Sequence, residues 1–512
     1  MAVCCRGNHG TVIGNIPCTK DYEIKRDQRS ESLIPIRMIT KTAWKNIWRN
    51  RVRSMVVIAS VAIGIFSGVF AIGVMEGVMK QRVDAALNGE ISHIQVTHPD
   101  FRSNSDLNFY IDNTDRVVSD IKGIEGVESV ASRLVIIGMA NTASNSAGVQ
   151  INGINPEDEK RVFNLYQEIY TGSGGYFNED TREGSVYLGV DLAKSLNIIR
   201  YIVTDEGLES LATRKVPVSV IEKLKPFVDE RFKNEKTFKR ELKSILEPAE
   251  EAKYGYLIRE SAQSFSDRAR LTLTFLDSQN NQTGGRFRIV GLYDVSNSIY
   301  EGFQIFVRED ELHKLTGIPG NVSHQVIVRV KDVDNTMEIA GKIKSLCPDL
   351  EVMTWQKIQP DLAMMSELTA IMYAFFMSII LAALAFGIVN TMLMVVLERT
   401  KELGMLTAIG MNKKKVFRMI MTESVLLSLT GGVVGMILSK ILILVTARTG
   451  INLSSMQEGF EQMGFSPHIY PEIATKYFIL VAIMIIITGI LASVYPALKA
   501  LRLDPADALR TE

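Results

Sequence analysis

Side chains that often carry catalysis are present in this chain, but not at the spacings that catalysis requires. The sequence contains no G-x-x-x-x-G-K-[ST] phosphate-binding loop, no H-E-x-x-H zinc motif and no G-x-S-x-G nucleophile motif. His93 and His98 flank the end of a predicted strand, where a structural role is favoured over ligation. Near the start, four potential metal ligands fit no zinc spacing: Cys4, Cys5, His9 and Cys18. We therefore expect no catalytic site, no metal site and no cofactor on this chain.

A charged segment between two apolar stretches is the strongest candidate for a functional site. Residues 397–417 read LERTKELGMLTAIGMNKKKVF, and Glu398, Lys401, Glu402 and Met405 fall at helical spacing. We predict a short helix along the membrane surface, with its charges turned toward the cytoplasm and its apolar side chains toward the lipid. Gly410 is expected to end this helix, and lysines 413–415 to contact lipid headgroups. Such a helix can anchor a loop, or it can receive force from a cytoplasmic motor; the residues alone leave both open.

The apolar stretches around this segment are long enough to cross a membrane. About 20 helical residues span a hydrocarbon core of about 30 Å. Four stretches contain a window of that length with no charge other than Lys440, which we expect to extend toward the headgroups rather than to line a permeation path. The predicted transmembrane helices are residues 54–78, 367–397, 421–447 and 476–499.

The distribution of basic residues predicts the orientation. Residues 37–53 contain several arginines and lysines and no acid, the loop at 398–420 is also rich in basic residues, and the loop at 448–475 leans acidic. Cytoplasmic loops carry the excess of Lys and Arg. We therefore expect both termini and the 398–420 loop in the cytoplasm, with residues 79–366 and 448–475 outside.

The N-terminal region divides into two parts, and a short tail closes the chain. Residues 1–35 are polar and without pattern, so we expect a disordered tail, and Met38 is an alternative start to Met1. Residues 36–53 predict an amphipathic interfacial helix, and residues 500–512 a cytoplasmic tail. The apolar face of the interfacial helix is formed by Ile36, Ile39, Ala43 and Ile47, with Trp44 and Trp48 beside it.

The outer region predicts an α+β domain of two subdomains. Near each of its ends the pattern is strand, helix, strand, which suggests one subdomain that the chain leaves and re-enters. Strand-like segments at 185–196, 271–276 and 285–293 suggest a second, β-rich subdomain. The strand–helix–strand segments are 91–97, 113–122 and 127–137, followed by a strand at 149–154, and then 324–330, 335–346 and 350–355.

Residues 200–266 interrupt this domain. They are dense in charges of alternating sign and have helical spacing over 220–246, which is typical of a solvated helical insertion. A spacer without chemistry is the favoured interpretation, and a docking surface for a partner is the alternative.

Several stretches resemble the permease core of the FtsX/MacB superfamily of ABC transporters. They are NTMLMVVLERTKELGMLTAIGMNKKKVFRMIMTESVLLSLTGGVVG at 390–435 and YPALKALRLDPADALR at 495–510. The front end, KTAWKNIWRNRVRS at 41–54 and NGEISHIQVTHPDF at 88–101, is most similar to the Lol-type (LolC/LolE-like) lipoprotein-releasing permeases. The resemblance implies an integral membrane α-helical protein with four transmembrane helices and a large α+β extracytoplasmic domain of the MacB/LolC type. The insertion at 200–266 departs from the family pattern.

The resemblance also implies a mechanism, mechanotransmission in the bacterial inner membrane. This chain would be the permease, and ATP and Mg would bind a partner ATPase dimer in the cytoplasm. A second permease copy or paralogue, membrane lipids and a lipoprotein or periplasmic partner are the other expected contacts, with no nucleic acid. Lipoprotein release is the expected task, with efflux of peptides or small molecules and regulation of a cell-wall hydrolase as alternatives. The implied ATPase-coupling residues are Glu398, Arg399, Lys401, Glu402, Met405, Leu406, Ala408, Lys413 and Lys414.

Two further sets of residues are candidates for packing and for substrate contact. Glycines spaced by four allow helices to approach closely, within the chain or between two chains; they are Gly64, Gly68, Gly73, Gly77, Gly431 and Gly435. Large apolar side chains can line a cavity for acyl chains, or simply face lipid; they are Phe66, Phe70, Met75, Met372, Phe375 and Phe376.

Overall fold

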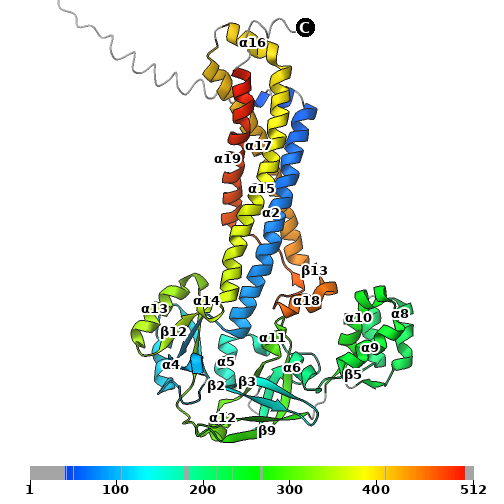
Figure 1. Ribbon diagram of the computed structural model, residues 1–512, viewed down its shortest axis with the longest axis vertical. Helices are drawn as coiled ribbons and strands as arrows, with labels where there is room; N and C mark the ends of the chain where they lie inside the picture. Colours follow the sequence, from blue (N-terminus) through cyan, green and yellow to red (C-terminus); the bar gives the residue numbers. More distant parts are fainter. Residues whose placement is uncertain are drawn as a thin grey trace, which may run out of the picture. The chain divides into compact units, whose positions relative to one another are not determined.

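A computed structural model describes residues 41, 43–45, 47–49, 51–104, 106–177, 184–214, 216–232, 234–265, 269–409 and 411–501. The predicted tail at 1–35, Met38, Gly410 and the tail from 502 onward lie outside these residues. The chain divides into two units, shown with their elements in Figure 1. The membrane unit comprises Met1–Ile72, Tyr373–Ile443 and Ile473–Glu512, and the outer unit comprises Gly73–Met372 and Leu444–Glu472.

Four helices within the described residues are long and apolar enough to cross a membrane, which confirms the predicted fold class. They are α2 (Arg51–Ala85), α15 (Pro360–Glu398), α17 (Lys413–Thr449) and α19 (Thr475–Leu501). In the membrane unit they enclose an apolar core that includes Ile65, Val69 and Met392, while side chains such as Phe386 are exposed. An exposed apolar surface is what a helix needs where its solvent is lipid.

Two of these helices continue beyond the apolar windows into the outer unit. α2 runs to Ala85 and is followed by the π-helical turn η1 (Ala86–Glu90), while α15 begins at Pro360. Met79, Leu87 and Leu362 pack with Trp355 in a small apolar cluster. α2 and α15 therefore continue beyond their apolar windows because this second core buries one face of each helix there.

The outer unit is built on a sheet of nine described strands, in the order β12-β1-β11-β2-β3-β10-β4-β9-β8. β2 also pairs with β8, at Met139 and Thr274, and this closes the six strands from β2 to β8 into a barrel. The strands are β1 (Ile94–Thr97), β2 (Val127–Asn141), β3 (Ser146–Ile154), β4 (Ser185–Gly189), β8 (Arg270–Leu276), β9 (Gln282–Tyr293), β10 (Gln304–Arg308), β11 (Gln325–Val330) and β12 (Glu351–Thr354).

Two hydrophobic cores correspond to the two predicted subdomains. One lies between β1, β2 and β11 and the helices α4 (Thr114–Lys122) and α13 (Thr336–Leu346). The other fills the barrel and continues into the insertion. The subdomains are not separate sheets, however, because the 15-residue strand β2 runs through both.

The predicted strand at 185–196 is only partly correct. β4 ends at Gly189, and residues 190–195 form the helix α6 (Val190–Ser195). Leu192, Ala193 and Leu196 are buried at helical spacing, and Lys194 pairs with Asp191 one turn earlier at 2.9 Å.

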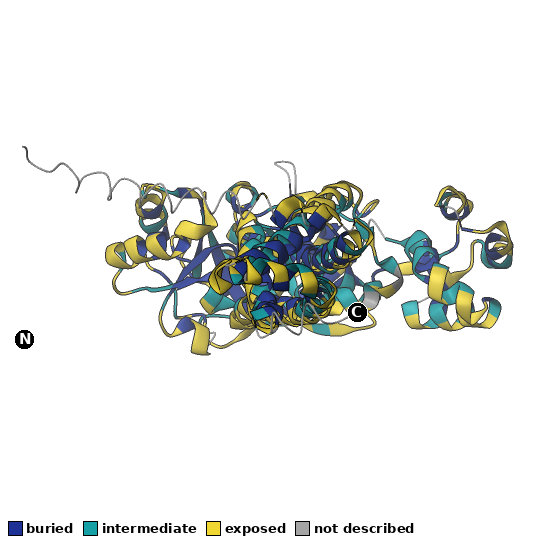
Figure 2. Ribbon diagram, turned by 90° about the horizontal axis from the view of Figure 1, so that it is seen from above, coloured by how far each residue is buried: buried dark blue, intermediate teal, exposed yellow. Residues whose placement is uncertain are grey.

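The insertion at 200–266 is folded, and its apolar interior is continuous with the core of the barrel. It contains α7 (Asp205–Thr213), α8 (Val218–Leu224), α9 (Glu235–Ile245) and α10 (Pro248–Ala262), together with the small sheet β6-β5-β7 (Arg231–Phe232, Arg200–Ile202 and Gln263–Ser264). Inside it, Tyr201 stacks on Phe238 with ring centroids 5.3 Å apart. Figure 2 shows exposed residues over the outward faces of these helices.

The helix predicted over 220–246 is interrupted. α8 ends at Leu224, Lys225–Phe227 form a single 3-10 turn, and β6 intervenes before α9. Pro226 lacks the N–H that a continuing α-helix needs, and Asn234 begins α9 anew by accepting a hydrogen bond from the Thr237 N–H at 2.9 Å.

A hairpin connects α17 to α19 and is fixed to the end of α2 within the outer unit. We call it the outer hairpin; it contains β13 (Ile451–Asn452), α18 (Gln457–Gln462) and β14 (His468–Ile469). The Glu472 N–H donates to the Gly73 carbonyl at 3.0 Å. The Gln81 amide donates to the His468 carbonyl and accepts from the Tyr470 N–H, both at 3.1 Å.

Candidate functional site

The predicted surface helix exists as α16 (Thr400–Ala408), directly after α15 in the membrane unit. Leu403 is buried in the core of this unit, and Leu406 packs against that core. Met405 and Ile409 point the other way, with exposed fractions of 52% and 79%. Lys401 and Ala408 are also exposed, so one face of α16 is anchored and the other is open.

The acidic side chains of this region pair with arginines of the same chain. Arg53 donates to both carboxylate oxygens of Glu398. Arg49 donates to Glu402 at 2.7 Å, and Arg399 donates to the other oxygen of Glu402 at 2.9 Å. The hydrogen bond from Arg49 lowers the pKa of Glu402, so this carboxylate stays charged at neutral pH.

A more buried pair connects this network to the next helix. Arg399 donates to Glu423 of α17 at 3.3 Å, and the side chains are only 15% and 6% exposed. Removing one partner of a buried pair leaves an uncompensated charge, which typically costs about 3–5 kcal/mol. The exposed pairs contribute about 0–1 kcal/mol each, so they act mainly by fixing geometry.

Arg49 belongs to the short helical segment that precedes α2. Ala43 and Ile47 of this segment are buried, whereas Trp44 and Trp48 are exposed and meet edge to face at 6.1 Å. Ile36 and Ile39, which were predicted on the same apolar face, lie outside the described residues. The basic residues at 37–53 served in the sequence only to predict the orientation, and no pattern indicated that Arg49 and Arg53 pair with Glu402 and Glu398.

The lysines after α16 lie at the first turn of α17. The Asn412 side chain accepts a hydrogen bond from the Lys414 N–H at 2.9 Å, and the Met411 N–H donates to the Leu406 carbonyl at 3.0 Å. Lys413 and Lys414 are exposed, so the structure leaves them accessible.

The predicted packing glycines lie at close contacts inside the chain. A Cβ atom at Gly431 would come within 2.8 Å of Val61, and one at Gly435 within 2.6 Å of the Ala62 carbonyl, so α17 packs directly on α2. Gly64 and Gly68 likewise face side chains of α15. In the outer unit, Gly73 and Gly77 contact the outer hairpin rather than a helix.

The large apolar side chains predicted as cavity candidates do not form one cluster. Phe66 and Phe70 stack at 6.3 Å on α2, and Phe375 contacts Phe376 on α15. Four of the six are exposed, as lipid-facing side chains are: Met75, Met372, Phe375 and Phe376. Lys440 is exposed on α17, with its ammonium 5.5 Å from the Phe478 ring centroid.

Comparison with known proteins agrees with this geometry in the C-terminal part of the chain. Residues 374–505, which contain α16, match the family model of the FtsX-like permease C-terminal domain. The lipoprotein-releasing system transmembrane protein LolC of Xylella fastidiosa is 24% identical over 239 residues, which cover 44% of this chain and 55% of LolC. An uncharacterized ABC transporter permease of Methanocaldococcus jannaschii is 26% identical over 234 residues, with the same coverage. The match therefore spans about half the length of these relatives.

A shorter stretch is similar to an exporter, and the outer region aligns with two solved structures. The macrolide export ATP-binding/permease protein MacB of Escherichia coli is 36% identical over 126 residues, 25% of this chain and 17% of MacB. The periplasmic region of MacB from Actinobacillus actinomycetemcomitans aligns over 55% of this chain and 98% of its own, with 10% identity and a TM-score of 0.28. The extracellular domain of the transporter YknZ aligns over 51% of this chain and 98% of its own, with 13% identity and a TM-score of 0.27.

The family model covers most of α15, all of α16 and α17, and α19, which hold Glu398, Glu402 and Glu423. The partners Arg49 and Arg53 precede the matched residues. These matches confirm the resemblance to FtsX/MacB-type ABC permeases that the sequence suggested. The chain carries an FtsX-like permease domain at residues 374–505.

Proposed function

We propose that this chain is the membrane subunit of an ABC transporter that works by mechanotransmission. A separate cytoplasmic ATPase dimer binds the exposed face of α16 and pushes on it, and the membrane helices pass the movement to the outer unit. ATP and Mg bind the ATPase, since this chain has no phosphate-binding loop. A second copy of this chain, or a paralogue, completes the pair of permeases.

The observation that carries this proposal is the two-sided character of α16. Its inner face is held by Leu403 in the core and by the Arg49–Glu402 pair, while Met405 and Ile409 stay exposed. Exposed apolar side chains beside charges are typical of a protein interface. A helix that is fixed to its own body and open on the other side is suited to transmit a push.

We further propose that the work delivered outside is the release of lipoproteins from the bacterial inner membrane. The match to LolC supports this, because it covers 44% of the chain, whereas the match to E. coli MacB covers 25%. The match to MacB has the higher sequence identity, 36% against 24% for LolC, so export of peptides or small molecules is the second candidate.

Reconstitution tests the two candidates against each other. The chain is purified with the ATPase that copurifies with it, placed in proteoliposomes and loaded with a fluorescent lipoprotein. ATP-dependent appearance of the lipoprotein in the soluble fraction with a carrier protein is the expected result. If lipoproteins stay membrane-bound in vitro and are correctly sorted in cells lacking the chain, while tolerance to macrolides or peptides changes, the release proposal is wrong and export takes its place.

A further inference from the structure

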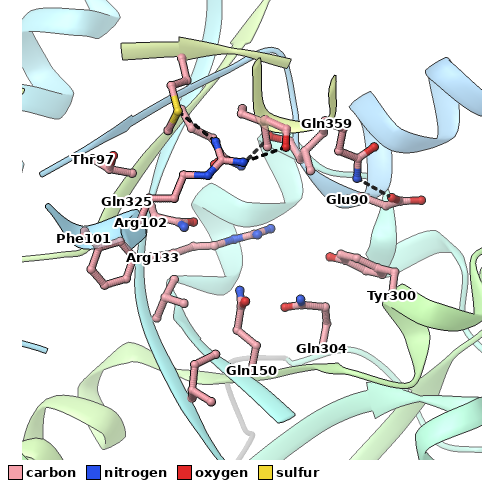
Figure 3. A pocket seen from close by; sticks show the side chains of 16 residues that line it. Glu90, Thr97, Phe101, Arg102, Arg133, Gln150, Tyr300, Gln304, Gln325 and Gln359 are labelled. Atoms are coloured by element: carbon pink, nitrogen blue, oxygen red, sulfur yellow. Dashed lines mark hydrogen bonds between the residues drawn. The ribbon is translucent and has the colours of Figure 1, made fainter. Parts of the chain in front are cut away.

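One face of the sheet in the outer unit is polar where a covered sheet face is usually apolar. On β1 and β11, Ile94, Val96, Val326 and Val328 point into the core beneath α4 and α13. The other face of the same sheet lines a pocket of about 300 Å³ (Figure 3). The polar residues of this pocket come from adjacent strands: Gln95 of β1, Gln325 of β11, Arg133 of β2, Gln150 of β3 and Gln304 of β10.

The floor of the pocket is buried and its mouth is open, since Ile137 at its edge is 50% exposed. Thr97, Arg133 and Gln95 are 2%, 4% and 8% exposed. Burial of polar groups is costly unless hydrogen bonds replace those made to water. The buried polar side chains at the floor of the pocket are therefore expected to have a partner.

Each charged side chain around the pocket already makes a hydrogen bond or an ion pair. Arg133 pairs with the buried Glu159, and Glu90 accepts from Arg82 at 2.8 Å and from Gln359 at 3.4 Å. Arg102 donates through both terminal nitrogens, to the Met353 sulfur and to the Ile358 carbonyl, each at 3.0 Å. Because no charge in this set lacks an interaction, a neutral ligand fits the pocket better than an ion.

The amides in the pocket offer unused donors and acceptors. Gln150 donates to Asn152 at 3.1 Å, and Asn152 donates to Gln304 at 2.8 Å. Among the described residues, this chain of bonds leaves the Gln150 Oε1 and the Gln304 Nε2 without a partner, and Gln325 makes no side-chain hydrogen bond. The Thr97 Oγ1 and the Gln359 Oε1 are buried and unpaired as well.

Apolar side chains line the pocket beside these amides. Ile137 and Met353 line the same pocket, and so does Phe101, whose ring stacks on His324 at 4.6 Å. A ligand for such a lining needs both hydrogen-bond donors and acceptors, together with small apolar groups. A peptide main chain has this chemistry, because each residue offers one N–H and one C=O.

We propose that this pocket binds a short, neutral, extended peptide segment, whose main-chain groups pair with the amides of Gln150, Gln304 and Gln325 while its side chains contact Ile137 and Met353. A volume of about 300 Å³ equals that of roughly ten water molecules, so two or three residues fill it. The segment is either a free peptide or the end of a larger polypeptide. As a substrate site the pocket rests on the proposed function, but peptide binding itself does not require the ATPase.

The test uses the full chain in nanodiscs and N-acetyl-trialanine amide as the probe, with binding followed by saturation-transfer NMR. We expect saturable binding below about 10 mM, and a loss of affinity of about tenfold for each of Gln304→Leu and Gln325→Leu, since each removes about one hydrogen bond. Gln282→Leu is the matched control, because Gln282 is exposed at the start of β9. Unchanged thermal unfolding of all three variants shows that they fold.

Three outcomes overturn the proposal: no binding up to that concentration, equal binding by Gln304→Leu, Gln325→Leu and the control, or displacement of the probe by glucose. The same probe sequence, placed on a flexible linker at the N-terminus of a folded reporter protein, distinguishes the two sources. Binding of both forms supports the end of a polypeptide, and binding of the free amide alone supports a free peptide. ATP-dependent release of lipoprotein is measured on the same preparations. Release without peptide binding contradicts the pocket proposal alone, and peptide binding without release contradicts the proposed function alone.

Discussion

The guanidinium of Arg53 donates to both carboxylate oxygens of Glu398, and it thereby joins the beginning of α2 to the end of α15. Arg49 makes the equivalent connection to Glu402, two residues into α16. The surface helix is thus held by the segment that precedes the first membrane helix. A displacement of α16 must therefore either break these pairs or move α2 with it.

Reversal of both acidic charges should uncouple ATP hydrolysis from transport. Glu398→Arg with Glu402→Arg places two new cations beside Arg49, Arg53 and Arg399. We expect the ATPase to stay bound and active while transport falls about tenfold, which corresponds to a coupling free energy of about 1.4 kcal/mol. The measurement is the ratio of ATP hydrolysed to substrate released in proteoliposomes.

The compensating exchange is the control for that experiment. Adding Arg49→Glu and Arg53→Glu to the reversed protein restores opposite charges across both pairs and should recover most of the transport. Lys45→Glu, at an exposed position of the same helical segment, should have no effect. Normal transport by the reversed protein, with the ATPase bound, would show that the pairs do not transmit force.

Charging the open face of α16 should remove ATPase binding. Met405→Asp and Ile409→Asp each place a carboxylate where we propose an apolar contact, and this is expected to weaken binding at least about tenfold. Stability should change by less than about 0.5 kcal/mol, because both side chains are largely exposed. Copurification of the ATPase is the measurement. The control is Met337→Asp on α13, since Met337 is 72% exposed in the outer unit, and undiminished copurification with the α16 variants contradicts the proposed docking face.

A methyl group on the glycine face of α17 should destabilise the membrane unit. A Cβ at Gly435 meets the Ala62 carbonyl at 2.6 Å, so Gly435→Ala forces α2 and α17 apart at an expected cost of about 1–3 kcal/mol. At Gly387, in α15, no atom lies within 4 Å of the added Cβ among the described residues. Gly387→Ala should therefore be neutral or stabilising by up to about 1 kcal/mol. Thermal unfolding in detergent ranks the two variants, and an equal effect of both would mean that this close contact is not made.

The outer unit should lose stability in acid because of His324. Its ring is fully buried, accepting from the Val135 N–H at 3.0 Å, and burial lowers the pKa of His324 to about 4. In the unfolded chain the pKa is about 6.5. As the pH falls from about 6.5 to about 4, the unfolded state binds a proton that the folded state refuses, so stability declines by up to about 3 kcal/mol over this range.

Thermal unfolding measured across this pH range checks the prediction. His93 is also buried, and its pKa is likewise lowered to about 4, so it adds to the same decline. His324→Gln should make the unfolding temperature less dependent on pH than in the unaltered chain. A variant with the same pH dependence as the parent would assign the acid sensitivity to other groups.

The membrane helices could be predicted because the hydrocarbon core imposes a simple rule on sequence. The windows that lack charge coincide with α2, α15, α17 and α19. α2 and α15 extend further because Met79 and Leu362 find an additional core in the outer unit. The strands and helices near each end of the outer unit could also be predicted, since apolar residues recur with strand or helix periodicity in β1, α4, β11 and α13.

Features that depend on long-range pairing could not be predicted. The closure of β2 on β8 joins Met139 to Thr274, and no local pattern records that choice. The interior of the insertion was hidden for another reason: the buried Phe238 and Leu242 stand among charged residues, which dominate the composition of the segment. The sequence also showed α16 itself, but not that its acids pair with residues 345 and 353 positions away.

The polar pocket could be predicted only in part. The alternation of Ile94, Gln95, Val96 and Thr97 predicts a strand with one polar face, which usually faces water. Only the fold reveals that Gln150, Gln304 and Gln325 join the same face and that this face lines a pocket with a buried floor.

The outer hairpin restricts the movement of the last turns of α2 because the two are joined through their main chains. Where long flexible side chains join two segments, each can shift by an ångström or more before the other responds. Here a main-chain bond from Glu472 to Gly73 sets the spacing, and a Cβ at Gly77 would come within 2.3 Å of the Tyr470 carbonyl. The two strips of backbone are in direct contact, so a small displacement of one cannot be absorbed between them. Within the outer unit, the segment between α17 and α19 and the last turns of α2 must therefore travel as one piece.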